Sequence, residues 1–334
     1  MHTNALPLRR RALLAFALAP VLGSMQARAS AQQAQVYPTR PLKLIVGFPP
    51  GGSTDLVARI VAPALAAKLG QPCIVDNKTG MGGGLAIDAV AKASPDGYNL
   101  VVASSGGLTA HPSLYKTLPY QPQKDLAPVS LLGYSPLVLA ANNAVPANNA
   151  AELIALARKQ PGKLSYGSGG PGTALHLAGE LFKSMSKADI VHVPYRGTAP
   201  ALVALMGGEI ELAFVDTASA IPQIKAGKMK AIGSLGKKRS SITPDIQTLD
   251  EGGLPGYDAS GWFAVLAPAG TPLPVIQRLN AELVSVLSSR ENQARLAAAY
   301  LDPSSSTPEA LAELIAQDTA KWSRVIKAAN ITLD

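Results

Sequence analysis

Residues 42–70 have the sequence LKLIVGFPPGGSTDLVARIVAPALAAKLG, and this stretch decides the fold class. Its first seven residues form an apolar run of the length of a buried strand, which two glycines then interrupt. The apolar side chains that follow recur at helical spacing, so the sequence predicts a helix that Ser53 or Thr54 caps and that Gly70 ends.

The alternation of strand and helix continues along the chain. A strand at 73–76, a helix at 83–93 and a strand at 98–104 come next, and this order is typical of a parallel sheet with helices on both faces. The next predicted helix–strand pairs are 149–159 with 164–167, 173–186 with 189–193, 197–206 with 210–215, and 217–226 with 229–235.

Two adjacent apolar runs stand where a strand can leave the first sheet and enter a second one, and a later run provides the return. These runs are 128–133, 136–141 and 260–267, and three further helices follow at 272–288, 290–299 and 307–329. We therefore expect an α/β protein with two lobes, parallel-rich sheets, flanking helices and a two-strand hinge that lets the lobes close around a ligand. Residues 37–136 plus 260–334 would form lobe 1, and residues 137–259 would form lobe 2.

The first thirty-one residues have the features of a signal peptide. Three arginines at 9–11 precede an apolar run at 12–23, and small residues at 27–31 offer two overlapping cleavage sites. The run is shorter than the roughly 20 residues of a spanning helix, which argues against the alternative of a membrane anchor. The arginine pair also fits a twin-arginine signal, so the export route stays open. The sequence predicts an exported, periplasmic protein from which residues 1–31 are removed.

The composition argues against several classes of function. Hydrophobic residues make up 47% of the chain and charged residues only 16%, so a large core can form. The formal charge is +8, and removing the four arginines of residues 1–31 leaves +4, which agrees weakly with an anionic ligand. The sequence lacks a basic block with interleaved aromatic residues, which would indicate nucleic-acid binding. Lys237-Lys238-Arg239 is the only basic cluster in the sequence after residue 31, and we interpret it as a solvated loop.

Few side chains suit metal, thiol or cofactor chemistry. The single cysteine, Cys73, lies in a predicted strand, where we expect a buried and unreactive thiol. The four histidines lack the spacing of metal ligands. The stretch Gly80–Gly84 lacks the Gly-Lys-Ser/Thr ending of a phosphate-binding loop, so we interpret it as a turn before a helix. We therefore expect neither a metal ion nor a cofactor.

Three strand ends rich in glycine and serine are the candidate binding loops, because ligands of open α/β sheets lie beyond the carboxyl ends of the strands. They are Phe48–Asp55, Ser104–Gly107 and Ser165–Thr173. Their glycines let the backbone approach a ligand, and a following helix turns free N–H groups toward an anion. Thr173 can cap such a helix, and the amides of 168–174 can surround an anion. Each loop could instead be a plain turn, and Asp55 is well placed to support the helix start.

Further residues are predicted at the same strand ends. His176 lies one turn into the helix after the third loop, where a packed histidine is the alternative. Arg196, in the loop that follows the strand at 189–193, can pair with a second carboxylate or be solvated. Asp216 can accept a hydrogen bond from a ligand hydroxyl or amine.

The sequence lacks the arrangements of common hydrolytic sites. It contains no nucleophile elbow, no carboxylate pair beside a strand-end loop and no Ser-His-Asp set. We therefore predict a protein that binds its ligand and is not an enzyme. An exported hydrolase that uses Ser53, Ser168 or His176 is the remote alternative.

Several segments resemble the tripartite tricarboxylate transporter receptor family, whose members are also called Bug proteins. The similarity runs from residue 37 to the end and rests on the segments as a set, since most of them singly are turns or caps. The segments are YPTRP at 37–41, FPPGGSTD at 48–55, PDGY at 95–98, PSLY at 112–115, HLAGE at 176–180, VPYRG at 193–197, IKAGK at 224–228 and LAPAGTP at 266–272.

The resemblance implies a type II-like periplasmic-binding-protein fold and a small carboxylate ligand: a di- or tricarboxylate, an amino acid or an aromatic acid. It also implies that backbone N–H groups and ordered waters hold the carboxylate near the first glycine loop, in place of an arginine salt bridge. Carried over by position, the ligand-binding residues are Phe48, Gly51, Gly52, Ser53, Thr54, Asp55, Ser104, Ser105, Gly106, Ser168, Gly169, Thr173, His176, Tyr195, Arg196 and Asp216.

Two positions beside the expected pocket depart from the family. Relatives more often have asparagine where this chain has Ser105, and a smaller residue where it has Leu175, so the ligand can differ from familiar ones. The implied partners are the membrane subunits of a tripartite transporter. A ligand sensor that serves a sensor kinase is the alternative. We expect a monomer that binds no nucleic acid.

Overall fold

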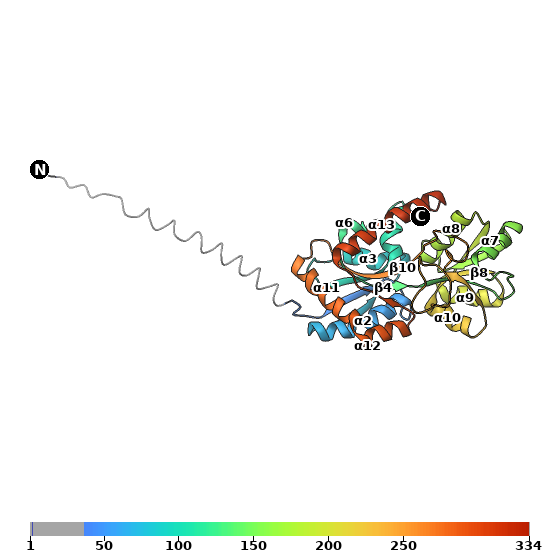
Figure 1. Ribbon diagram of the computed structural model, residues 1–334. Helices are drawn as coiled ribbons and strands as arrows, with labels where there is room; N and C mark the ends of the chain where they lie inside the picture. The colour runs from blue at the N-terminus through green and yellow to red at the C-terminus, as the bar shows by residue number, and fades with distance from the viewer. Residues whose placement is uncertain (1, 3–36, 334) are drawn as a thin grey trace. The chain divides into compact units, whose positions relative to one another are not determined.

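The computed structural model describes residues 2 and 37–333, and the chain from Arg40 onward forms one compact unit. This unit holds two β-sheets that are flanked by helices (Figure 1). Apart from residue 2, the predicted signal peptide lies outside the described residues. No helix of the described part combines the length and the apolar character needed to cross a bilayer.

The first sheet has six strands. They are β1 (Leu42–Val46), β2 (Cys73–Asn77), β3 (Asn99–Ser104), β4 (Leu126–Ser135), β10 (Gly261–Pro268) and β11 (Asp302–Pro303). In space their order is β11-β4-β10-β3-β1-β2. β1 pairs in parallel with β2 and β3, whereas β10 runs antiparallel to its neighbours β3 and β4.

The second sheet has five strands. They are β5 (Leu137–Ala141), β6 (Leu164–Ser168), β7 (Ile190–Pro194), β8 (Leu212–Asp216) and β9 (Lys230–Ser234). Their order is β7-β6-β8-β5-β9, with β6 parallel to β7 and β8, and β5 antiparallel to β8 and β9. Each sheet thus combines a parallel trio with antiparallel strands, as expected for the mixed α/β, two-lobed fold.

Helices cover both faces of each sheet. In Figure 1, α3 and α13 lie on one side of the first sheet and α2 and α12 on the other, while α7 and α8 lie opposite α9 and α10 around the second. The long helices are α2 (Ser53–Leu69), α3 (Gly84–Ala91), α7 (Ala150–Lys159), α8 (Ala174–Ser186), α9 (Thr198–Gly207), α10 (Thr217–Lys225), α11 (Leu273–Ser288), α12 (Arg290–Ala298) and α13 (Pro308–Ala328). Shorter ones are the 3-10 turn η1 (Met81–Gly83), α4 (Ser105–Thr109), α5 (His111–Leu114) and α6 (Pro122–Asp125).

The chain passes between the two sheets twice. β4 leads through Pro136 directly into β5, and residues 235–260 return the chain from β9 to β10. The lobe boundaries expected from the sequence stay a proposal. The last helix, α13, contacts both cores, because Leu311 packs in the core of the first sheet and Trp322 in the core of the second.

Local predictions were correct for most helices and wrong at three points. The helix from residue 53 to residue 69 is confirmed, but Gly52 is its N-cap and neither Ser53 nor Thr54 caps it. The third loop does end in a cap, since the Thr173 side chain accepts a hydrogen bond from the His176 amide.

The other two corrections concern β3 and β2. The residues after β3 form the helix α4 and not a loop, because the chain turns directly into a helical conformation at Ser105. Cys73 is half-buried, not buried, since β2 is an edge strand. Burial still raises the pKa of its thiol to about 11, so the thiol is protonated at neutral pH.

Candidate ligand-binding site

The predicted loops lie at the carboxyl ends of neighbouring parallel strands in both sheets. The loop Phe48–Asp55 follows β1, and Ser104 ends the adjacent strand β3. In the second sheet Ser168 ends β6, Tyr195 follows β7 and Asp216 ends β8, with β6 between the other two. The candidate residues therefore gather at one edge of each sheet, the edge at which α/β proteins bind their ligands.

Asp55 organises the first loop from inside the protein. Its side chain is 1% exposed, and its Oδ2 accepts hydrogen bonds from the Gly51 amide at 2.9 Å and from Arg59 Nε at 2.8 Å. Asn77 Nδ2 donates to Asp55 Oδ1 at 2.8 Å and to the Phe48 carbonyl at 2.9 Å. Both carboxylate oxygens are thus engaged by the protein itself, which makes Asp55 a residue that positions the loop.

The same hydrogen bonds keep Asp55 ionised. Although burial raises the pKa of this carboxyl, the bonds from Arg59, Gly51 and Asn77 outweigh burial and leave the pKa below its usual value. The charge is balanced locally by the guanidinium of Arg59.

The first loop has backbone amides that find no partner within its helix. Gly52 is the N-cap of α2, and the amides of Ser53 and Thr54 have no carbonyl within the helix to which they could donate. Gly51 has a φ of +87°, a left-handed conformation that favours glycine, and both glycines are exposed. Amides at the start of a long helix attract an anion, because the helix dipole adds to their partial positive charge.

The turn Gly80–Gly84 packs against the first loop and is more than a plain turn. A Cβ on Gly47 would collide with the backbone of Gly83, and a Cβ on Gly83 would lie 3.0 Å from the ring of Phe48. The absence of side chains at these glycines lets the two segments meet, so the turn supports the ring of Phe48. This contact could not be predicted from local sequence, because the two segments are far apart along the chain.

His111 lies against this turn and is linked to α4 through Tyr120. The sequence analysis did not select it as a site residue. Its Nδ1 is hydrogen-bonded to the Tyr120 hydroxyl at 2.8 Å, and that hydroxyl donates to the Gly107 carbonyl at 3.0 Å. Nδ1 is therefore the donor, and the neutral ring has no proton on Nε2. A Cβ on Gly82 would lie 3.1 Å from this Nε2. Burial lowers the pKa of His111 to about 4, so the ring is neutral at neutral pH.

Side chains also fold the third loop onto itself. The Gly170 amide donates to Ser168 Oγ at 3.2 Å, and the Gly172 amide donates to His176 Nδ1 at 3.2 Å. Thr173 Oγ1 donates to the Gly170 carbonyl at 2.7 Å. The Thr173 amide also donates to the Gly170 carbonyl, at 3.3 Å, so at least three amides of 168–174 are bound within the protein. That amides of this loop surround an anion stays a prediction. The amides of Ala174 and Leu175, at the start of α8, have no carbonyl within the helix to which they could donate.

A stack of rings lies beneath the third loop. The imidazole of His176 stacks on His192 with centroids 4.2 Å apart, and His192 stacks on Tyr166 at 4.8 Å. His192 Nε2 is hydrogen-bonded to Ser168 Oγ at 2.8 Å, so the stack supports both ends of the loop. Burial and the neighbouring His176 lower the pKa of His192 to about 4, and burial also lowers the pKa of His176. Sequence reasoning missed His192, although it lies on β7 just before the Tyr195 loop.

The loop after β7 lies against the third loop. The Gly197 amide donates to the Gly169 carbonyl at 3.2 Å, and a Cβ on Gly170 would lie 3.0 Å from the Tyr195 carbonyl. Arg196 is exposed between them, and none of the ion pairs within residues 37–333 includes it. Its guanidinium is therefore open to an anion.

Asp216 has a structural role at the end of β8. Its Oδ1 accepts a hydrogen bond from the Ser219 amide at 2.9 Å, so it is the N-cap of α10. The next residue, Thr217, donates from its amide to the Pro136 carbonyl at 3.0 Å and from its hydroxyl to the Tyr300 carbonyl at 3.3 Å. This end of the candidate site is thus connected to the crossover between the lobes.

The two halves of the candidate site touch through α4 and the third loop. A Cβ on Gly106 would lie 3.5 Å from the Ala174 nitrogen and 3.8 Å from the Gly172 carbonyl oxygen. Leu333 covers the same loop, because a Cβ on Gly172 would lie 2.6 Å from its side chain, and its amide donates to the Leu114 carbonyl at 2.8 Å. Elements that flank the two sheets are therefore in contact at this point.

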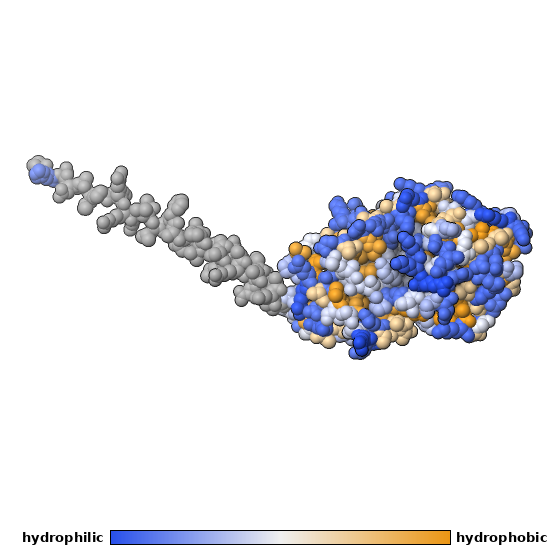
Figure 2. All heavy atoms as spheres, in the orientation of Figure 1, coloured by the Kyte–Doolittle hydropathy of each residue, from blue (hydrophilic) through white to orange (hydrophobic). Residues whose placement is uncertain are grey.

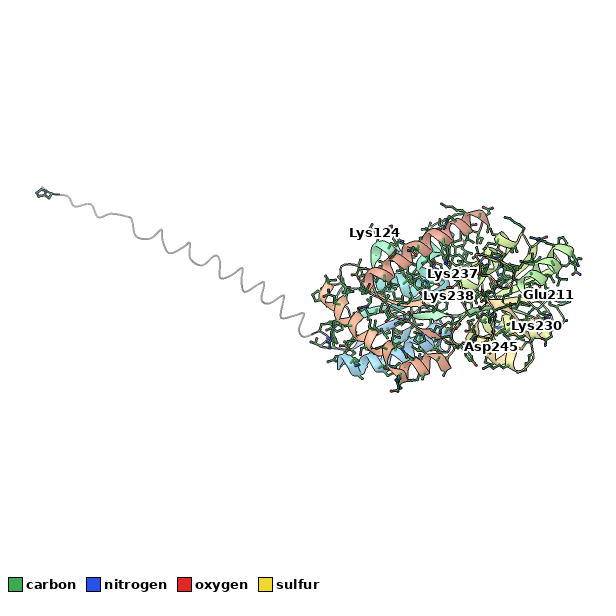
Figure 3. The ribbon with its side chains drawn as sticks, in the orientation of Figure 1. Lys124, Glu211, Lys230, Lys237, Lys238 and Asp245 are labelled. Atoms are coloured by element: carbon green, nitrogen blue, oxygen red, sulfur yellow. The ribbon has the colours of Figure 1, made fainter. Side chains whose placement is uncertain are left out.

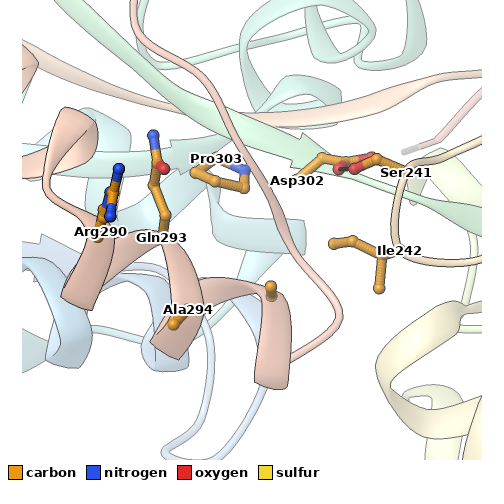
Figure 4. A pocket seen from close by; sticks show the side chains of 8 residues that line it. Ser241, Ile242, Arg290, Gln293, Ala294, Asp302 and Pro303 are labelled. Atoms are coloured by element: carbon orange, nitrogen blue, oxygen red, sulfur yellow. Dashed lines mark hydrogen bonds between the residues drawn. The ribbon is translucent and has the colours of Figure 1, made fainter.

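Three surface pockets lie away from these loops. One of about 500 Å³ is lined by α12, β11 and the loop after β9, where Asp302 faces Ser241 (Figure 4). A second of about 710 Å³ lies between α8 and α13, and a third of about 250 Å³ lies beside Asn142. None of the predicted ligand-binding residues lines these three pockets.

The chemistry available at the candidate site is that of anion binding. Within the described chain, no group of three or more His, Cys, Asp and Glu side chains is arranged to hold a metal ion. Ser168 and His192 pair as a nucleophile and a base would, but Ser168 is fully buried and its oxygen also accepts the Gly170 amide. The candidate loops carry amides, hydroxyls and one guanidinium, which are groups that donate hydrogen bonds to a carboxylate.

Comparison with known proteins identifies the family to which the chain is similar. The family model "Tripartite tricarboxylate transporter family receptor" matches residues 57–331. The protein BugT of Bordetella pertussis is 38% identical over 295 residues, which cover 88% of this chain and 90% of BugT.

Two similar solved structures contain a carboxylate. An R. palustris protein with adipate has a TM-score of 0.81 and 33% identity, covering 89% of this chain and 99% of its own. MatC from Rhodopseudomonas palustris with bound malate has a TM-score of 0.76 and 32% identity, covering 87% of this chain and 100% of its own. The chain belongs to the tripartite tricarboxylate transporter receptor family of periplasmic solute-binding proteins.

Proposed function

We propose that this protein captures a small carboxylate in the periplasm and delivers it to the membrane subunits of a tripartite transporter, without catalysing a reaction. The observation that carries the proposal is the contact of Gly106 with Gly172 and Ala174, because it brings the donor groups of two lobes to one place. The relatives solved with adipate and with malate support a dicarboxylate as the first class of ligand to test.

We assign different roles to the predicted site residues. The amides of the first loop and of α8 would bind the carboxylate, and Arg196 would pair with a second one. Asp55, Ser168 and His176 would act indirectly, because their polar atoms are bound to the loops that they hold. The proposed contact residues are then Phe48, Gly51, Gly52, Ser53, Thr54, Ser104, Ser105, Gly106, Gly169, Thr173, Tyr195, Arg196 and Asp216.

We also propose that residues 1–31 direct export and are cleaved, and that the exported protein is a monomer. The mass of the protein recovered from the periplasm tests the first point, since it gives the residue at which the chain begins. Sedimentation of the same preparation tests the second.

Thermal unfolding with a panel of acids tests the ligand class. The protein is first unfolded and refolded so that no co-purified ligand remains, and is then mixed with adipate, malate, citrate, glutamate or nicotinate. A ligand at 100 times its dissociation constant adds about 2.7 kcal/mol to the free energy of unfolding, which raises the midpoint by several degrees. The diamides of adipic and malic acid are matched controls of the same length without charge, and we expect them to have no effect.

Two results would contradict the proposal. One is a panel in which no acid raises the midpoint. The other is chemical change of a bound acid, observed by NMR after long incubation and abolished by His176→Ala, which would indicate an enzyme.

A further inference from the structure

A groove separate from the candidate ligand site lies between α8 and α13. It has a volume of about 710 Å³, and the loops between β9 and β10 form its remaining walls. Its apolar lining consists of Leu181, Met185, Tyr257, Val325 and Ala328. Its basic lining consists of Lys237, Lys238, Lys321 and Arg324. Lys237 and Lys238 belong to the basic cluster that the sequence alone indicated to be a solvated loop.

Three of the four basic side chains in this groove are uncompensated. Lys237, Lys238 and Arg324 are exposed, and no ion pair between the described residues includes them. Lys321 differs, since its Nζ lies 2.9 Å from Asp318 Oδ1. Figure 3 shows Lys237 and Lys238 on the face turned to the viewer, and in Figure 2 strongly hydrophilic residues gather in the middle of that face.

Two acidic residues, Asp250 and Asp258, also line the groove and offset part of this charge. Asp250 accepts a hydrogen bond from the Gly256 amide. Asp258 accepts hydrogen bonds from the amide and the hydroxyl of Ser260, at 3.1 Å and 2.7 Å. Both carboxylates also stabilise the loop 250–260, and the four basic side chains leave the lining with an excess of positive charge over these two.

The combination of an apolar lining with basic residues from separate elements favours one type of occupant. A single small anion would satisfy the cations but leave the apolar residues exposed. A segment with acidic residues on one side and apolar residues on the other would satisfy both, as amphipathic helices do in the grooves that bind them. Lys237 and Lys238 come from a loop and Arg324 from α13, so such a segment would contact both walls.

We propose that this groove docks an acidic, amphipathic segment of a protein partner. The end of α13 that lines the groove packs in the core of the second sheet, since Val325 belongs to that core, as do α8 and Tyr257 from the other walls. The proposed docking face therefore belongs to the second sheet and its helices. If the partner is a transporter subunit, that identification rests on the proposed function, whereas the docking itself does not.

A designed peptide tests the docking. The probe is a fluorescent helical peptide of about 18 residues, with leucine along one face and glutamate elsewhere. Its binding to the purified protein is measured by fluorescence anisotropy at two salt concentrations. We expect binding that weakens with salt, and that weakens about tenfold or more in the double variant Lys237→Glu/Lys238→Glu.

The matched control changes the same number of charges elsewhere. Lys124 on α6 and Lys159 on α7 are exposed and line none of the three pockets, and Lys124 lies apart from the groove in Figure 3. Lys124→Glu/Lys159→Glu should bind the peptide within about twofold of the unchanged protein. Met185→Glu alters the apolar lining without removing a cation, and it should also weaken binding about tenfold.

Several outcomes would overturn the proposal. These are the absence of peptide binding, equal loss in both charge-reversal pairs, and equal binding of a peptide with lysine in place of glutamate. Binding of phosphatidylglycerol vesicles that depends on Lys237 and Lys238, without binding of the peptide, would assign the groove to a membrane surface instead. The assay contains none of the small acids of the thermal panel, so its failure is distinguishable from the failure of that panel.

Discussion

Asp55 shows how a single buried carboxylate can determine the shape of a binding loop. Asparagine at this position would present an N–H group either to Asn77 or to Gly51 and Arg59, which are all donors. We expect Asp55→Asn to lower the free energy of unfolding by about 1–3 kcal/mol. We also expect it to weaken carboxylate binding about tenfold, because Gly51 is released. Urea unfolding and calorimetric titration measure the two effects.

Glu291 provides the control for this change. It lies 4.0 Å from Arg295 and its side chain is 82% exposed. Glu291→Gln should therefore change the free energy of unfolding by less than about 1 kcal/mol and leave affinity unchanged. If Asp55→Asn kept full affinity, the first loop would not depend on the Asp55 carboxylate.

His111 gives the protein a sensitivity to acid. Burial lowers its pKa in the folded protein from 6.5 to about 4. Between these values the unfolded chain binds a proton that the folded chain does not, so the free energy of unfolding falls as the pH falls through this window. One such group lowers the free energy of unfolding by about 2 kcal/mol between about pH 7 and about pH 5. The lowered pKa of His192 acts in the same direction.

Replacing His111 by asparagine isolates its share of this effect. His111→Asn retains a group that can hydrogen-bond with Tyr120 but cannot titrate. We expect the variant to be less stable at neutral pH and to lose less stability on acidification. Urea unfolding at the two pH values makes the comparison, and an equal loss in both proteins would show that His111 is not responsible.

At the scale of elements, helices with a cap or glycine signal and a long apolar face could be predicted from the sequence. The helix that begins at Ser53 has the predicted bounds, and α8 begins one residue after the predicted start because Thr173 is its cap. α4 could not be predicted, since its five residues, SGGLT, carry no apolar periodicity. The half-buried state of Cys73 depends on the position of β2 at the sheet edge, which local sequence does not encode.

The candidate site was accessible to sequence reasoning only in part. The placement of loops at strand ends follows from the alternation of strand and helix, because parallel strands share a carboxyl edge. The contacts that support those loops, such as His192 with Ser168 or Gly83 with Phe48, join residues far apart in the chain. Such contacts are set by tertiary packing, so neither periodicity nor spacing can reveal them.

The contact between α4 and the third loop leads to a prediction about two helices and their glycines. The Cβ of a residue at position 106 would lie in ordinary contact with the Ala174 nitrogen, at 3.5 Å, so the branches of valine would push the two backbones apart. We expect Gly106→Val to weaken carboxylate binding about tenfold, measured by calorimetry. Gly207→Val is the control, because a Cβ on Gly207, at the end of α9, would meet nothing within 4 Å. Equal affinity in the two variants would mean that binding does not need this contact.

For the whole molecule, the relative position of the lobes depends on more than the two crossovers. α13 packs in both cores, through Leu311 on one side and Trp322 on the other. Thr217 binds the Tyr300 carbonyl close to the first crossover. A third restraint joins the loop after β9 to β11, where the hydroxyls of Ser240 and Ser241 each donate to Asp302 at 2.6 Å.

The restraint at Asp302 should influence how often the lobes separate, because its donors and its acceptor belong to different lobes. We expect Asp302→Ala to broaden the distribution of distances between the lobes. The distances can be measured by pulsed EPR with labels at Lys68→Cys and Lys159→Cys in a Cys73→Ser background. A wider distribution lowers the population of the state in which α4 contacts the third loop, so ligand affinity should fall by about threefold to thirtyfold. Asp245→Ala is the control, since Asp245 is exposed and no hydrogen bond between described residues involves it. If both variants gave the same distances and affinity, the crossovers and α13 alone would set the arrangement of the lobes.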